Sequence, residues 1–104
     1  MIFIESPIFT EDLSNHLTDA QYQEFQIYLA ANPDAGAVMQ DTGGLRKVRW
    51  SAKMSGKRGG VRVIYYHRVA AHQIRMILIY QKGVKDDLTF AEKKLLRELN
   101  KGWQ

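Results

Sequence analysis

The sequence of 104 residues contains no cysteine and only two prolines. Without cysteine there are no disulfide bonds and no thiolate metal sites, so packing must stabilise the fold. No apolar run approaches the roughly 18 residues that a membrane-spanning helix needs. The apolar start, MIFIESPIF, carries no basic residue and is interrupted by Glu5 and Pro7. We therefore expect no signal peptide, no membrane association and a cytoplasmic protein.

Acidic residues are missing from the middle of the chain, between Asp41 and Asp86. The same stretch holds 11 of the 15 Lys and Arg residues, although the whole chain has a net charge of only +4. Such segregation causes self-repulsion, which either an anionic partner or the fold itself must offset. The stretch also lacks the carboxylate pair that many hydrolases use. His16, His67 and His72 are too far apart in the sequence to suggest a metal site, and no cofactor is expected.

The length and the hydrophobic content of 45% suit one domain spanning residues 1–104. In the N-terminal part we expect a strand over residues 2–5 and a brief helix capped by Thr10. Thr18 and Gln21 form a capping box that opens a longer helix, which ends before Pro33. These two helices are predicted to form a hairpin that covers one face of a sheet.

Three stretches further along the chain are predicted to be strands. Leu45–Trp50 alternates, Val61–Val69 is rich in β-branched and aromatic residues, and Ile74–Gln81 is a nearly continuous apolar run. Their short connections predict an antiparallel meander, with the most apolar stretch, 74–81, near its centre. Residues 35–44 are interpreted as a loop. The sequence therefore predicts an α+β fold with a small antiparallel sheet, an N-terminal helical hairpin and a C-terminal helix.

The C-terminal helix is opened by a second capping box, Thr89 with Glu92. Its apolar residues recur on one face and are interpreted as core packing; they are Phe90, Leu95, Leu96, Leu99 and Trp103.

Alternation along the strands places Lys47 with Arg49, Arg62 with Tyr66, and Tyr80 with Lys82. In a meander these side chains can converge on one surface, where Arg and Lys would bind phosphate oxygens. Tyr65, Tyr66 and Tyr80 offer flat surfaces for base stacking. His67 and His72 could act as an acid or a base, but His67 alternates with the opposite face, and a surface or strand-end position is the favoured interpretation for both. The pattern favours binding to RNA.

Several segments closely resemble the HigB/RelE-type toxins of bacterial type II toxin–antitoxin modules: GGLRKVR, KRGGVRVIYYHR, ILIYQK, KDDLT and AEKKLLRELN. The resemblance implies a RelE-like α+β fold and a metal-independent endoribonuclease that cleaves mRNA on the 70S ribosome. It also implies a cognate antitoxin, often with a helix-turn-helix domain, through which alone operator DNA would be bound. Relatives commonly carry Asn-Glu where this chain has Gly83-Val84.

The resemblance implies that the RNA 2′-hydroxyl attacks the adjacent phosphate, with Lys47 or Arg49 near the attacking and leaving groups. Arg62 and Lys82 would stabilise negative charge, and Tyr80 would orient the base or transfer a proton. The candidate catalytic residues are Lys47, Arg49, Arg62, Tyr80 and Lys82, and the candidate RNA-binding residues are Arg46, Lys53, Lys57, Arg58, Tyr66 and Lys85.

Two other functions remain open from the sequence. Related ParE-type toxins inhibit DNA gyrase and cleave no RNA, although they generally lack the full basic set. A non-catalytic RNA-binding module would show salt-dependent binding without cleavage.

Overall fold

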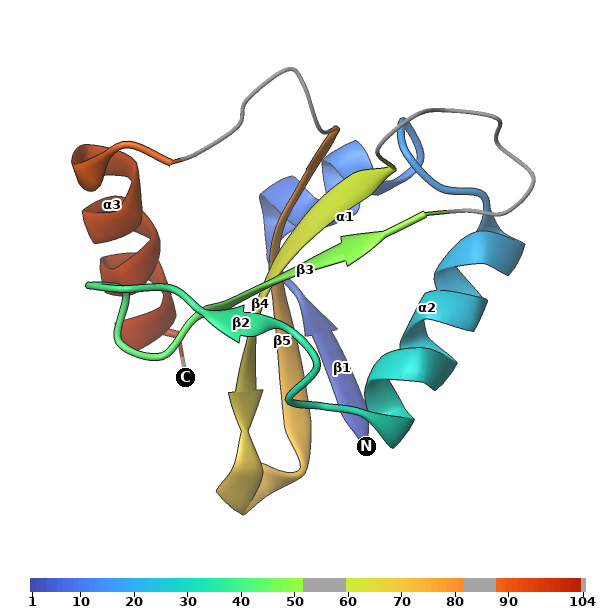
Figure 1. The fold of residues 1–104 in the computed structure, drawn as a ribbon, viewed down its shortest axis with the longest axis horizontal. Coiled ribbons are helices and arrows are strands. Elements are labelled where there is room, and N and C mark those ends of the chain that lie inside the picture. The colour runs from blue at the N-terminus through green and yellow to red at the C-terminus, as the bar shows by residue number, and fades with distance from the viewer. Residues whose placement is uncertain (52–59, 82–87, 104) are drawn as a thin grey trace.

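In the computed structural model, which describes residues 1–51, 60–81 and 88–103, a five-stranded sheet separates helices on its two faces (Figure 1). The strand order is β1-β5-β4-β3-β2. The strands are β1 (Ile2–Glu5), β2 (Ala37–Val38), β3 (Arg46–Trp50), β4 (Val61–Arg68) and β5 (Gln73–Gln81). The helices are α1 (Pro7–Leu13), α2 (Asp19–Ala31) and α3 (Phe90–Lys101), and a 3₁₀ turn covers Val69–Ala71.

The sheet is mixed, so the expectation of a purely antiparallel sheet is wrong in one respect. The β3–β4 and β4–β5 pairs are antiparallel and confirm the meander, whereas β1 runs parallel to β5. Parallel strands need a long connection, and the chain between β1 and β5 is long enough to provide one. A short turn would have made the pair antiparallel. The two-residue strand β2 lies within the expected loop and pairs with β3.

The first helix begins earlier than the sequence indicated. The Ser6 hydroxyl accepts a hydrogen bond from the Phe9 amide at 3.1 Å and donates one to the Ile77 carbonyl at 2.7 Å. Ser6 is therefore the N-cap, and Pro7 occupies the first turn, where its missing N–H has no consequence. The expected start at Thr10 is wrong. The capping box of Thr18 and Gln21 is confirmed at the start of α2.

Each face of the sheet has its own core. On one face, Phe9 of α1 and Phe25 and Leu29 of α2 pack against strand residues such as Val63 and Met76. On the other face, α3 and the residue before its cap contribute Leu96 and Leu88 to a smaller core, which also contains Leu45, Ile64 and Ile77. Figure 1 shows α1 and α2 on one side of the sheet and α3 on the other.

The helix α3 uses only part of its apolar surface for packing. Its capping box is confirmed, and Leu96 is buried. However, Phe90, Leu95 and Leu99 are 72%, 70% and 44% exposed, so the expected single core stripe is wrong. Adjacent residues on a helix point about 100° apart, and the small core under α3 receives Leu96 but not Leu95. Among the helices described, none is long and apolar enough to cross a membrane.

Candidate functional site

Three of the candidate residues form a row across the sheet. In the strand register Arg49 of β3 lies opposite Arg62 of β4, and Arg62 lies opposite Tyr80 of β5. Opposed residues in antiparallel strands have Cβ atoms about 5 Å apart and side chains on the same face. We call Arg49, Arg62 and Tyr80 the cross-strand row.

The row lies on the face that carries α3. Arg62 alternates with Ile64 along β4, and Ile64 packs with Leu88 and Leu96 in the α3-side core. Lys47 lies opposite Ile64 and therefore shares this face, two residues from Arg49. The structure thus brings Lys47, Arg49, Arg62 and Tyr80 together, as the alternation predicted.

The row gathers positive charge on two neighbouring strands. Arg49 and Arg62 are like charges on directly opposed residues, an arrangement that destabilises a strand pair. The three strands of the meander contribute no carboxylate, because the sequence has none between Asp41 and Asp86. An anion bound at the row would offset this repulsion.

Five candidate residues lie outside the described part of the chain. They are the catalytic candidate Lys82 and the RNA-binding candidates Lys53, Lys57, Arg58 and Lys85. Gly83 and Val84, which replace the Asn-Glu pair of the relatives, also lie there.

Arg46 does not join this surface. Its side chain lies on the opposite face, where Nη1 donates to the carbonyls of Gly36 at 2.7 Å and Asp34 at 3.2 Å. Its Nη2 is 3.5 Å from the Asp34 carboxylate, which also lies 2.8 Å from His67 Nδ1. The hydrogen bond from His67, and then the charge of Arg46, hold the pKa of Asp34 below its usual value. Arg46 therefore fastens the loop before β2, on the face opposite the cross-strand row, and its role as an RNA-binding candidate stays a prediction.

Tyr65 is also unavailable for base stacking, contrary to expectation. Its ring is fully buried in the core under α1 and α2. Its hydroxyl donates to the Pro33 carbonyl at 2.8 Å and accepts from the Gly36 amide at 2.9 Å. Burial raises the pKa of this phenol. Tyr65 is thus a structural residue that anchors the loop after α2.

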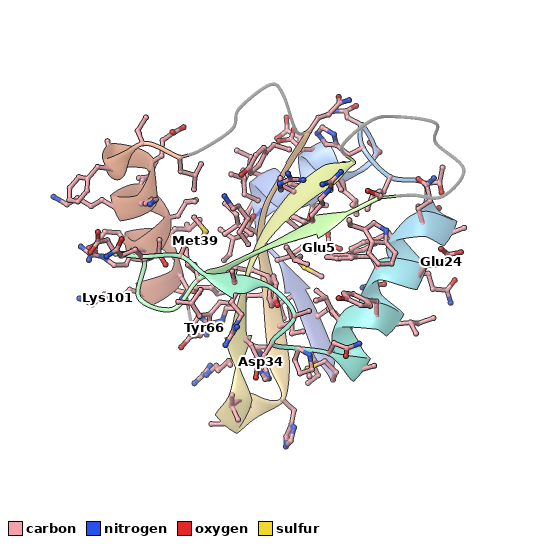
Figure 2. The ribbon with its side chains drawn as sticks, in the orientation of Figure 1. Glu5, Glu24, Asp34, Met39, Tyr66 and Lys101 are labelled. Carbon is pink, nitrogen blue, oxygen red and sulfur yellow. The ribbon has the colours of Figure 1, made fainter. Side chains whose placement is uncertain are left out.

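Tyr66 lies on the α3 side of the sheet, but at a distance from the row. Its ring lies 5.8 Å from the guanidinium carbon of Arg75, and both residues line a cavity near the end of α3. Figure 2 shows Tyr66 on this side of the sheet, toward the end of α3 that carries Lys101. The one feature of the sequence that could have indicated this cavity is the single arginine within the apolar stretch IRMILIYQ.

The described residues offer no metal-binding cluster. Within residues 1–51, 60–81 and 88–103, no group of three His, Asp or Glu side chains could hold a metal ion. The side chains of Lys47 and the cross-strand row supply cations and a phenol, which can bind phosphate, stabilise negative charge and move protons.

No model of a known protein family matches the chain.

Proposed function

We propose that the protein is the toxin of a type II toxin–antitoxin module, with a RelE-like fold, and that it cleaves mRNA on the ribosome. The observation that carries this proposal is the convergence of Lys47 and the cross-strand row on one sheet face. Three cations and a phenol within a few residue spacings match the needs of a scissile phosphodiester. The resemblance of the basic strands to RelE-type toxins supports the same conclusion.

The reaction divides among these residues. Lys47 takes the proton from the RNA 2′-hydroxyl, whose oxygen then bonds to the adjacent phosphorus while the bond from phosphorus to the 5′-oxygen breaks. Arg62, with Arg49 beside it, stabilises the negative charge that develops on the phosphate oxygens. The departing 5′-oxygen receives a proton, with Tyr80 orienting the base or supplying that proton. The products are a 2′,3′-cyclic phosphate and a free 5′-hydroxyl. Lys82, outside the described residues, is assigned to charge stabilisation from the sequence alone.

An antitoxin can inhibit such a site by binding to one face of the sheet. The helix α3 packs on Ile64, which lies opposite Lys47, so a partner that displaces α3 also reaches the row. An acidic segment is the natural partner for the cations gathered on this face. We expect this antitoxin to carry a helix-turn-helix domain that binds operator DNA, and the toxin to act in the cytoplasm.

The test is cleavage of mRNA on programmed 70S ribosomes by purified wild-type protein and by an Arg62→Ala variant. We expect the variant to lose at least about 100-fold in cleavage rate, the size of effect seen when a transition-state donor is removed. Lys94→Ala removes an exposed cation of α3 outside the row and serves as the matched control. Cleavage by Arg62→Ala at the wild-type rate would rule out the row as the active site.

Expression in cells separates this function from gyrase inhibition. Ends mapped inside translated codons after a short pulse of expression would support mRNA cleavage. Double-strand breaks and an SOS response with intact transcripts would instead identify a gyrase inhibitor. Salt-dependent RNA binding without any cleavage on ribosomes would leave only an RNA-binding module.

A further inference from the structure

A second group of cations lines a cavity of about 400 Å³ on the α3 side of the sheet. Arg68 comes from the end of β4, Arg75 from β5, and Arg97 and Lys101 from α3. Along β4, the lining residues Tyr66 and Arg68 lie four and six positions from Arg62, roughly 13 and 20 Å away at the usual rise of a strand. The cavity is thus separate from the cross-strand row, and the apolar contact of α3 with Ile64 lies between them.

Arg75 is held in one position by its neighbours. The residue is only 5% exposed, and its Nη1 donates to both the backbone carbonyl and the side-chain oxygen of Asn100, at 3.1 and 3.2 Å. Its Nε donates to Gln73 Oε1 at 3.1 Å. The rings of Tyr66 and Trp103 lie 5.8 and 5.3 Å from its guanidinium carbon. None of the three hydrogen bonds uses Nη2, and the side chain has little freedom left to lose on binding a ligand.

The charge of Arg75 is not neutralised by an acid in the described structure. All its hydrogen-bond acceptors are neutral oxygens, and the ion pairs found among the described residues do not include it. The lining residues described include no Asp or Glu, whereas three further cations face the same cavity. The carbonyl of Asn100 at the end of α3 carries part of a helix dipole and compensates only partly. A buried cation among other cations is stabilised strongly by an anion of matching size.

Another part of the cavity wall is formed by Thr42 and Gly43, which contacts within the protein hold in place. The Thr42 hydroxyl donates to the Met39 carbonyl at 2.7 Å and accepts from the Leu45 amide at 3.1 Å, which fixes the turn. Gly43 has φ +75°, and a Cβ there would lie 3.3 Å from Cγ of Arg97. The stem of Arg97 therefore passes directly over the glycine, and a side chain at position 43 would crowd it.

We propose that this cavity, which we call the arginine pocket, binds a phosphate group of single-stranded RNA. The inference rests on the proposed function, since it makes the pocket a second contact for the strand that is cut at the cross-strand row. Cations that bind backbone phosphates next to aromatic rings are the usual composition of single-strand binding sites. The separation of roughly 13 to 20 Å places this contact outside the scissile linkage, so it contributes to binding and not to the bond-breaking step.

The first experiment uses Trp103 as the reporter. Trp50 lies on the other face of the sheet, against Phe25 and Tyr28, with ring centroids 5.3 Å away in each case. A Trp50→Phe variant of the full chain leaves Trp103 as its single tryptophan. We expect its fluorescence to change on titration with pyrophosphate, and a short 2′-O-methyl oligoribonucleotide, which lacks the attacking hydroxyl, to compete for the same site.

Charge-removing substitutions at the exposed cations then test the assignment without disturbing buried Arg75. In the Trp50→Phe background, Arg68→Gln with Lys101→Gln should weaken both ligands roughly tenfold, the effect of losing a charged hydrogen bond. Lys94→Gln, an exposed cation on α3 that does not line the pocket, should leave both affinities unchanged. Affinities equal in the double variant and in the control would overturn the proposal.

Competition identifies the ligand class. Pyrophosphate binding that the oligonucleotide does not displace would overturn the assignment to RNA. Displacement by a poly-glutamate peptide at lower concentration than by the oligonucleotide would also overturn it, in favour of an acidic protein segment. Neither probe is cleaved, so binding to the arginine pocket is measured independently of mRNA cleavage. If the protein binds both probes but does not cleave mRNA, the pocket is supported and the proposed reaction is refuted.

Discussion

Arg49 and Arg62 face each other across β3 and β4, on the sheet face that α3 partly covers. Two like charges on opposed residues reduce the stability of a strand pair, and this pairing is central to the row proposed to bind the scissile phosphate. The two arginines are therefore expected to lower the stability of the fold while they contribute to the proposed function, as is common where charges are gathered for a ligand.

A substitution at Arg49 should therefore change stability and cleavage activity in opposite directions. We expect Arg49→Gln to raise the free energy of unfolding by about 0.5 kcal/mol, because it removes the repulsion with Arg62, and to slow mRNA cleavage. Urea denaturation at low salt measures the first effect, and programmed ribosomes measure the second. The gain in stability should shrink at about 1 M salt, where surface charges are screened. A loss of stability at low salt would show that the two cations do not repel.

The hydroxyl of Tyr65 provides a test of the loop after α2. Tyr65→Phe leaves the buried Gly36 amide and the Pro33 carbonyl without their partner and should lower the free energy of unfolding by about 1–3 kcal/mol. Tyr66→Phe is the matched control, since no hydrogen bond of that hydroxyl is described, and it should change stability by less than about 0.5 kcal/mol. Equal effects on thermal or urea unfolding would contradict the structural role assigned to Tyr65.

The lowered pKa of Asp34 predicts how the free energy of unfolding depends on pH. Its pKa is lowered in the folded state by His67 and Arg46, so the carboxylate stabilises the fold above its unfolded pKa of about 3.9. That contribution is lost as the pH falls through the lowered folded value. The wild type should thus be more stable than Asp34→Asn at neutral pH, and the difference should disappear progressively below about pH 4. Urea midpoints measured from pH 7 to pH 2 would show this convergence, and a constant difference would contradict it.

The sequence correctly predicted which residues of the central strands share a face. Period-2 alternation is enough to place Arg49, Arg62 and Tyr80 on one face once the strands pair in a meander, and the register confirms it. Local rules also located the helix starts at Thr18 and Thr89, because a capping box is complete within four residues.

What the sequence could not supply depends on contacts between distant segments. The parallel pairing of β1 with β5 joins residues about seventy positions apart and leaves no local pattern. Ser6 could end a strand or cap a helix, and its hydrogen bond to Ile77 is known only from the structure. The arginine pocket was missed for the same reason, since Arg75 meets Asn100 only when α3 packs on the sheet.

Two adjacent leucines of α3 test how this helix is held on the sheet. Leu96 is 9% exposed and packs in the α3-side core, whereas Leu95 is 70% exposed. Leu96→Ala should lower the free energy of unfolding by about 2–3 kcal/mol, through lost burial and the cavity left behind. Leu95→Ala makes the same chemical change at the adjacent position and should shift stability by less than about 0.5 kcal/mol.

The same two variants test whether α3 shields the face that the proposed antitoxin must reach. Leu96→Ala loosens the helix from the sheet and should speed association of that antitoxin in stopped-flow measurements. Leu95→Ala does not loosen the helix and should leave the association rate unchanged. Equal unfolding free energies for the two variants would mean that α3 does not pack through Leu96.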